Sequence, residues 1–92
     1  MYNFKYNLAK DKQLMERYGI GFENIISAIN NGGFIITVKH PNQGKYSTQE
    51  IMYIRYIDYV YAMPYVIETD GTLFLKTFYP SRKATKLYIE GK

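Results

Sequence analysis

The chain has 92 residues, of which 47% are hydrophobic and 22% are charged, a composition that argues against disorder and supports one small domain over residues 1–92. No apolar run reaches the roughly 18 residues of a membrane-spanning helix, the N-terminus lacks a signal-peptide apolar stretch, and the absence of cysteine excludes disulfides and thiolate metal sites. We therefore expect a cytoplasmic protein without a membrane partner, and the net charge of +4 favours an anionic partner such as nucleic acid or an acidic protein.

The first third of the chain predicts two helices. Asn7 is a candidate N-cap for a helix over Leu8–Tyr18, and Gly19 is a candidate residue for ending it. The second helix is indicated by apolar residues at positions i, i+3, i+4 and i+7, namely Phe22, Ile25, Ile26 and Ile29. An Asn-Asn-Gly-Gly run over residues 30–33 ends this helix.

From residue 34 onward the sequence has the pattern of β-strands. The expected strands are Phe34–Lys39, Gln49–Tyr56, Tyr59–Glu68 and Leu73–Phe78. A polar loop over His40–Lys45 joins the first two, and a Thr-Asp-Gly-Thr turn over residues 69–72 joins the last two. Asn3–Lys5 is a candidate edge strand, and Ser81–Tyr88 has the pattern of a short final helix.

These elements predict an α+β fold, in which two N-terminal helices pack on a four-stranded antiparallel sheet with a short C-terminal helix. Alternation along the third strand separates two sets of side chains. We expect the smaller side chains to pack under the helices; these are Val60, Ala62, Pro64 and Val66. We expect the larger side chains to point away from the helices; these are Tyr59, Tyr61, Met63 and Tyr65. Because proline donates no backbone hydrogen bond, we also expect a bulge at Pro64.

The junction between the last strand and the final helix carries the densest candidate chemistry. Tyr79 is followed closely by Ser81, Arg82 and Lys83, and backbone N–H groups at the start of a helix favour anions. Arg82 can hold a phosphate through two parallel hydrogen bonds, and Lys76 within the strand must reach solvent or an anion. Tyr79 is a candidate proton donor or base-stacking residue, and Ser81 fits an N-cap better than a nucleophile.

Three further residues are candidates for contact with nucleic acid. His40 is the only histidine, which excludes a two-histidine mechanism, and its loop position suits a general acid or base. Arg55 and Tyr61 would together form an aromatic and basic surface on the outer face of the sheet, where bases stack and phosphates pair. All of these side chains are also consistent with ordinary surface or packing roles.

The sequence indicates neither a metal nor a cofactor. The carboxylates of Glu50, Asp58, Glu68 and Asp70 are scattered over strand ends and turns, so their spacing predicts no metal cluster. The glycine pair at residues 32–33 lacks the pattern of a phosphate-binding P-loop.

Four stretches in chain order give the sequence a family resemblance: Phe4-Lys5-Tyr6-Asn7, the Arg-Tyr-Gly-Ile-Gly-Phe-Glu run over residues 17–23, His40-Pro41, and Ser81-Arg82-Lys83-Ala84-Thr85. They resemble the BrnT-type toxins of bacterial type II toxin–antitoxin pairs, which are relatives of the RelE and ParE toxins. The last stretch is similar to the Ala-Arg-Lys-Ala-Thr signature of that family. The resemblance implies a RelE-like fold and a metal-independent endoribonuclease that cleaves RNA and arrests growth. It also implies a DNA-binding antitoxin of the ribbon-helix-helix type, and a possible homodimer within the toxin–antitoxin complex.

We therefore expect a ribonuclease toxin with two groups of functional residues. The catalytic candidates are Arg82, Lys76, His40 and Tyr79, and the RNA-binding candidates are Lys83, Arg55 and Tyr61. The alternative is a non-enzymatic basic module that binds RNA or a protein, including a gyrase-binding toxin like ParE. Convergence of Lys76, Arg82 and either His40 or Tyr79 in one groove would favour the enzyme, whereas their scatter beside a large apolar patch on the tyrosine face would favour the module.

Overall fold

The computed structural model describes residues 3–42, 44 and 48–90. Within these residues the chain forms an α+β fold of three α-helices and a six-stranded mixed sheet. The predicted fold class is therefore confirmed, together with the N-terminal helices and the short C-terminal helix. Two residues of the predicted polar loop, Gln43 and Lys45, lie outside the described residues.

The N-terminal helices are α1 (Leu8–Tyr18) and α2 (Phe22–Ala28). The Asn7 side chain accepts a hydrogen bond from the Lys10 backbone N–H, and Gly19 has a φ angle of 78°, so both predicted caps of α1 are confirmed. α2 ends one residue before its predicted end. The segment η1 (Ile29–Gly33), whose helical backbone is interrupted at Asn31 and Gly32, then leads into the sheet.

The centre of the sheet is antiparallel, as predicted. It consists of β2 (Phe34–Lys39), β3 (Gln49–Tyr56) and β4 (Tyr59–Ile67). β2 pairs with β3 through a register shift between Phe34 and Ile36, and β3 pairs with β4 over the full length of the hairpin.

The prediction of four antiparallel strands is wrong at the other edge of the sheet. The expected fourth strand divides into β5 (Leu73–Leu75) and β6 (Tyr79–Pro80), which both pair with β4, because the chain between them turns inward to bury Phe78. β1 (Phe4–Tyr6) confirms the candidate edge strand, but it pairs with β5 in parallel. The sheet order is therefore β1-β5-β4-β3-β2, with β6 beside β4.

The bulge predicted at Pro64 is not in β4. Pro64 lies opposite Ile51 in an unbroken register with β3. The irregularity lies instead in the segment that pairs with β4 on its other side, where residues 76–78 separate β5 from β6. The Pro64 carbonyl accepts a hydrogen bond from the Lys76 backbone N–H at 2.9 Å. The Pro64 nitrogen faces the same side of β4 as the Pro64 carbonyl. Because strand pairing is interrupted on that side, the missing N–H of the proline leaves no acceptor without its donor.

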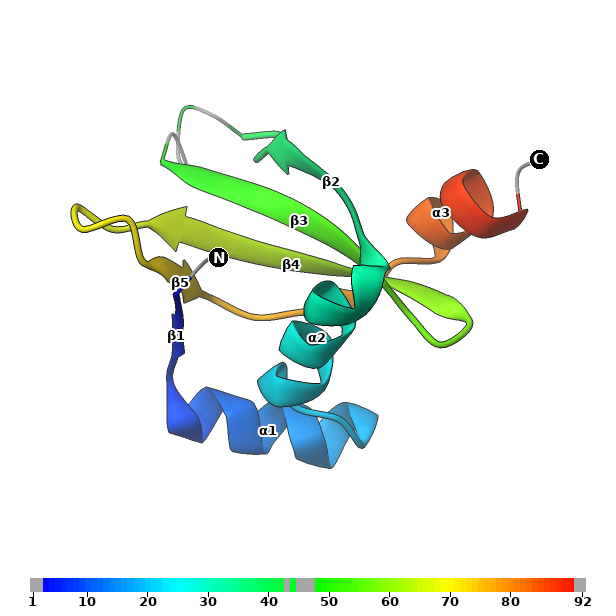
Figure 1. Ribbon diagram of the computed structural model, residues 1–92, viewed down its shortest axis with the longest axis horizontal. Coiled ribbons are helices and arrows are strands. Elements are labelled where there is room, and N and C mark those ends of the chain that lie inside the picture. Colours follow the sequence, from blue (N-terminus) through cyan, green and yellow to red (C-terminus); the bar gives the residue numbers. More distant parts are fainter. Residues whose placement is uncertain (1–2, 43, 45–47, 91–92) are drawn as a thin grey trace.

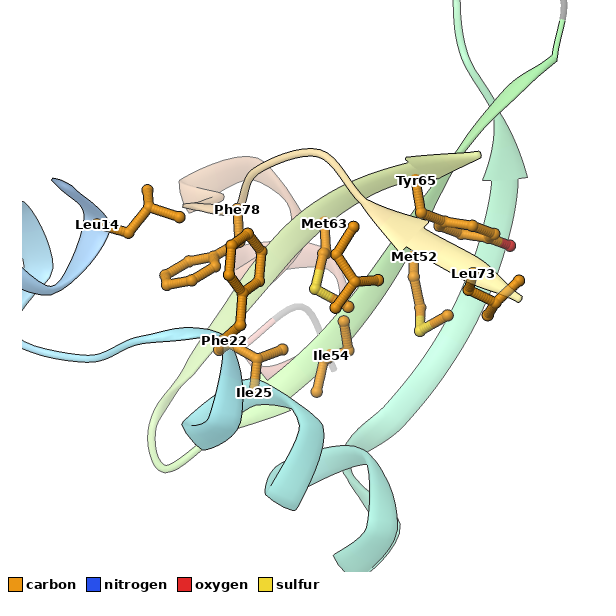
Figure 2. Close-up of a cluster of buried hydrophobic side chains, with 10 residues drawn as sticks. Leu14, Phe22, Ile25, Met52, Ile54, Met63, Tyr65, Leu73 and Phe78 are labelled. Carbon is orange, nitrogen blue, oxygen red and sulfur yellow. The ribbon is translucent and has the colours of Figure 1, made fainter. Parts of the chain in front are cut away.

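The main core lies between the sheet and the N-terminal helices, as Figure 2 shows. It contains Leu14, Phe22 and Ile25 from the helices, packed against Met52, Ile54, Met63, Tyr65, Leu73, Leu75 and Phe78. Phe22 and Phe78 meet edge to face, with ring centroids 5.2 Å apart. Full burial of such side chains stabilises the fold by about 1.5–3 kcal/mol each.

The orientation predicted for β4 is reversed. The larger side chains, Tyr61, Met63 and Tyr65, belong to or pack against the core under the N-terminal helices. Val60 and Ala62 lie on the opposite face, where they are buried beside the C-terminal helix. Alternation identified the two sets but not the helix layer that each set meets. The small side chains leave the space that a closely packed short helix needs.

The C-terminal helix, α3 (Arg82–Thr85), continues as a π-helical turn, η2 (Lys86–Glu90). Figure 1 shows α3 at the end of the sheet where β3 turns into β4, while α1 and α2 lie along the face of the sheet. No helix in the described part of the chain is both long and apolar enough to span a membrane.

Candidate nucleic-acid interface

The sheet face on which α3 packs, called the α3 face below, gathers three tyrosines at the end of the sheet near α3. Tyr53 of β3 lies next to Tyr88 of η2, with ring centroids 6.2 Å apart. Tyr79 of β6 pairs with Ala62 of β4 and therefore points to the same face. Its phenol is close enough to Tyr53 for the two groups to interact electrostatically.

A surface cavity of about 220 Å³ opens beside these tyrosines. It lies between α3, η2 and the sheet, and is lined by Val38, Tyr53, Ser81, Lys83, Ala84, Leu87 and Tyr88. Lys83 is exposed and supplies the cation among these lining residues. The cavity is thus lined by one lysine and two tyrosines.

Ser81 acts as the N-cap of α3, as predicted. Its hydroxyl accepts a hydrogen bond from the Ala84 backbone N–H at 3.1 Å, and its carbonyl accepts the Thr85 hydroxyl at 2.8 Å. Because the Ser81 hydroxyl already serves the helix end, the geometry favours a structural role for Ser81. An anion at this junction would be held by the side chains of Arg82 and Lys83.

Arg82 and Lys76 are exposed, and neither lines the cavity. Arg82 opens α3 next to Lys83. Lys76 follows β5, and its ammonium nitrogen lies 5.5 Å from the centroid of the Phe74 ring. Arg82 follows β6 and Lys76 follows β5, so both lie on the Tyr79 side of the sheet order and outside the cavity.

His40 and Tyr79 lie toward opposite edges of the sheet. Its backbone N–H donates to the Gln49 carbonyl; Gln49 pairs with Val66, whereas Tyr79 pairs with Ala62. His40 and Tyr79 are therefore separated by the width of β3 and β4 and by four residues along β4. At about 4.8 Å per strand and about 3.3 Å per residue, each offset is about 13 Å or more. The four catalytic candidates do not converge on one point.

Arg55 and Tyr61 do not form the predicted joint surface. Arg55 lies opposite Val60, and Tyr61 lies opposite Ile54, so the alternation of the strands puts their side chains on different faces. Tyr61 instead contacts Tyr56, Tyr59 and Phe78 on the side of the N-terminal helices. The Arg55 Nε donates to the Ile57 carbonyl at 3.1 Å, at the tip of the β3–β4 hairpin.

Burial raises the pKa of Tyr79 above its ordinary value, and the nearby Tyr53 adds to the shift. Burial likewise raises the pKa of Tyr61, which three other tyrosines surround. Tyr79 is exposed by 40%. Like any phenol it is protonated at neutral pH, so it can donate a hydrogen bond to a bound ligand.

Sequence reasoning missed Tyr53, Leu87 and Tyr88 as lining residues. The available signal was the spacing within the final helix: residues 83, 84, 87 and 88 share one side of a helix at i, i+1, i+4 and i+5. Among the described residues there is no group of three or more His, Asp or Glu side chains that could hold a metal ion.

Comparisons with protein-family models, with curated proteins and with solved structures found no match to this chain. A functional proposal therefore rests on the chemistry of the α3 face and on the sequence resemblance described above.

Proposed function

We propose that this protein is a metal-independent endoribonuclease that binds single-stranded RNA on the α3 face and cleaves it there. The observation that carries the proposal is a cavity lined by Tyr53, Tyr88 and Lys83, with Tyr79 close to Tyr53 on the same face of the sheet. Rings that stack bases, beside a cation that pairs with phosphate, are the combination used in single-strand recognition.

Cleavage without a metal requires an activated 2′-hydroxyl, a stabilised phosphorane and a protonated leaving oxygen. We assign Lys83 to the charge on the phosphorane, because it lines the cavity. We assign Tyr79 to protonation of the leaving 5′-oxygen, because a phenol, whose ordinary pKa is about 10, is protonated at neutral pH and Tyr79 is partly exposed beside Tyr53. The proton of the 2′-hydroxyl would pass to solvent water. Arg82 and Lys76 would hold the flanking phosphates. His40 would contact a strand that extends across the sheet.

The biological setting we propose is that of a cytoplasmic toxin in a type II toxin–antitoxin pair. RNA cleavage would arrest growth, and a DNA-binding antitoxin of the ribbon-helix-helix type would neutralise the toxin, which could pair with a second copy within that complex. This part of the proposal is supported by the four sequence stretches that resemble the BrnT-type toxins. The confirmed α+β class, with N-terminal helices and a short C-terminal helix on the sheet, is compatible with it.

A second candidate is a non-enzymatic module that binds RNA or a protein. The observation that favours it is the separation of His40 from Tyr79 across the sheet. Without His40 the cavity has one cation, Lys83, and the phenols of Tyr53 and Tyr88, but no side chain suited to accept a proton at neutral pH. The two candidates share RNA binding and differ in whether the RNA is cut.

The test compares purified variants on 5′-labelled RNA. Replacing Tyr79 with Phe removes the proton donor, so we expect cleavage to slow about 100-fold. Lys83→Gln should slow cleavage about tenfold or more, because it removes the cation in the cavity. Lys86→Gln is the matched control, since Lys86 is exposed on the same helical segment but does not line the cavity; it should change the rate less than about twofold.

Induced expression of the same variants in bacteria gives a second readout. Growth arrest with RNA loss in the wild type, relieved by Tyr79→Phe in a folded protein, would support the toxin. Folded wild-type protein that binds RNA without cutting it or slowing growth would favour the second candidate. Equal loss of cleavage in Lys83→Gln and Lys86→Gln would contradict a role of the cavity in cleavage.

A further inference from the structure

A second and larger groove lies at the tip of the β3–β4 hairpin. It has a volume of about 560 Å³ and lies between α2, η1 and the hairpin. Its lining includes Glu23, Asn24, Asn31, Arg55, Tyr56 and Ile57. None of the functions assigned above uses this groove.

Three unusual backbone features meet at the groove. Ile57 has a φ angle of 57°, which is strained for a β-branched residue, although its side chain is 71% exposed. A Cβ atom on Gly33 would lie 2.4 Å from the Arg55 carbonyl oxygen, so the chain approaches the hairpin as closely as only glycine allows. Within η1, Asn31 and Gly32 interrupt the helical backbone, and Gly32 takes a φ angle of 90°. Each feature costs free energy, and such costs gather at binding sites.

The polar side chains of the groove offer both donors and acceptors. The Asn24 side-chain oxygen accepts the Gly21 N–H, which leaves the Asn24 amide nitrogen without a bond to the other described residues. Asn31 has the opposite arrangement, since its amide nitrogen donates to the Ser27 carbonyl and its oxygen is not engaged within the described chain. Toward the other described residues, Arg55 donates through its Nε alone, to the Ile57 carbonyl. The groove therefore offers one amide donor, one amide acceptor and a guanidinium edge.

The charge of the groove argues against a simple anion as its ligand. Glu23 brings a carboxylate, which accepts the Tyr6 hydroxyl at 2.6 Å, and it offsets the charge of Arg55. Neutral groups that both donate and accept, next to the aromatic ring of Tyr56, suit the edge and face of a nucleobase. Arg55 lies two residues from Tyr53 on the same face of β3, about 7 Å along the strand. Because α2 and η1 lie on the opposite face of the sheet from α3, the groove meets the α3 face at Arg55, around the end of the sheet.

We infer that this groove is a nucleobase subsite for the RNA strand bound on the α3 face. The inference rests on the proposed function. It adds a site that binds a base, next to the site on the α3 face that binds the RNA backbone. Asn24 and Asn31 contact the edge of the base, Tyr56 contacts its face, and Arg55 holds the adjoining phosphate.

The test measures binding of short labelled oligoadenylate, oligocytidylate and oligouridylate by fluorescence anisotropy at low salt. Arg55→Gln should weaken binding about tenfold more than Arg17→Gln, which makes the same change of charge at an exposed position of α1. Asn24→Asp keeps the oxygen that accepts the Gly21 N–H but removes the amide donor. It should change the ratio of affinities among the three oligonucleotides by about fivefold. Its added negative charge alone would lower all three affinities equally.

The outcomes separate the two proposals. RNA binding that depends on Lys83, with an unchanged affinity ratio in Asn24→Asp and equal effects of the two arginine substitutions, would overturn the subsite and leave the proposed function standing. Altered ratios without any RNA cleavage would support the subsite and overturn the cleavage. No binding of any oligonucleotide by the wild type would overturn both.

Discussion

Two short polar side chains fix the position of α3. The Thr85 hydroxyl is buried, accepts the Val60 backbone N–H at 2.8 Å and donates to the Ser81 carbonyl at 2.8 Å. Ser81 in turn caps the helix and donates its own backbone N–H to the Val60 carbonyl. The cavity beside Lys83 thus depends on hydrogen bonds made by residues that do not contact a ligand.

Replacing Thr85 with Val should destabilise the protein by about 1–3 kcal/mol, because it leaves the buried Val60 N–H without an acceptor at nearly unchanged volume. Thr69→Val is the matched control, since Thr69 is exposed in the β4–β5 turn, and it should change stability by less than about 0.5 kcal/mol. Urea denaturation followed by circular dichroism measures both. Equal midpoints for Thr85→Val and the wild type would show that the Val60 N–H finds another partner.

At the scale of elements, the joint between α1 and α2 is closed by a carboxylate from the first helix. Asp11 accepts the Phe22 backbone N–H at 2.7 Å, so α1 provides the cap for α2 across the turn. A Cβ atom on Gly21 would lie 2.6 Å from this Asp11 oxygen and 2.9 Å from Met15. The small residue lets the two helices meet closely enough for the cap to form.

We predict that Asp11→Ala lowers the free energy of unfolding by about 1 kcal/mol, the usual value of a helix cap. Asp11→Asn should lose less, because the amide oxygen can still accept the Phe22 N–H. Glu16→Ala, on an exposed position of the same helix, serves as the control for lost charge. Should Glu16→Ala and Asp11→Ala cost the same in urea denaturation, the cap would have no measurable role.

Local signals predicted most elements, but not how neighbouring segments share the sheet. The caps at Asn7 and Gly19 and the bounds of β2 and β3 follow from local sequence, and the structure confirms them. The division of β5 from β6 depends on Phe78 turning into the core, a long-range packing effect. The parallel pairing of β1 is likewise a long-range contact that no local pattern encodes.

At the scale of the whole molecule, the candidate site was predictable in composition rather than in arrangement. Strand alternation places Arg55 and Tyr61 on different faces, and only the pairing of Arg55 with Val60 in the structure shows which face each side chain takes. The strand order likewise separates His40 from Tyr79, a separation that their loop and strand positions in the sequence do not reveal. Lys83, expected only as an RNA contact, is the cation that lines the cavity.

Tyrosine protonation links the stability of the whole molecule to alkaline pH. The hydrogen bond to Glu23 raises the pKa of Tyr6 to about 12 and joins β1 to α2. Burial raises the pKa of Tyr61 and of Tyr79 as well. Because the protonated phenols are favoured in the folded state, their stabilising effect is complete below the ordinary tyrosine pKa of about 10 and is lost as the pH rises through the raised values.

We therefore expect the urea midpoint of the wild type to fall between about pH 8 and about pH 12. Tyr6→Phe should cost about 1 kcal/mol near pH 8 by removing the hydrogen bond, yet it should lose less stability at alkaline pH, because phenylalanine does not titrate. Glu23→Gln removes the carboxylate that raises the pKa of Tyr6, so it should flatten the same part of the curve. If both variants instead follow the wild-type curve in parallel from about pH 8 to about pH 12, the Tyr6–Glu23 pair does not set the alkaline limit. The loss would then have to come from the other tyrosines with raised pKa, Tyr61 and Tyr79.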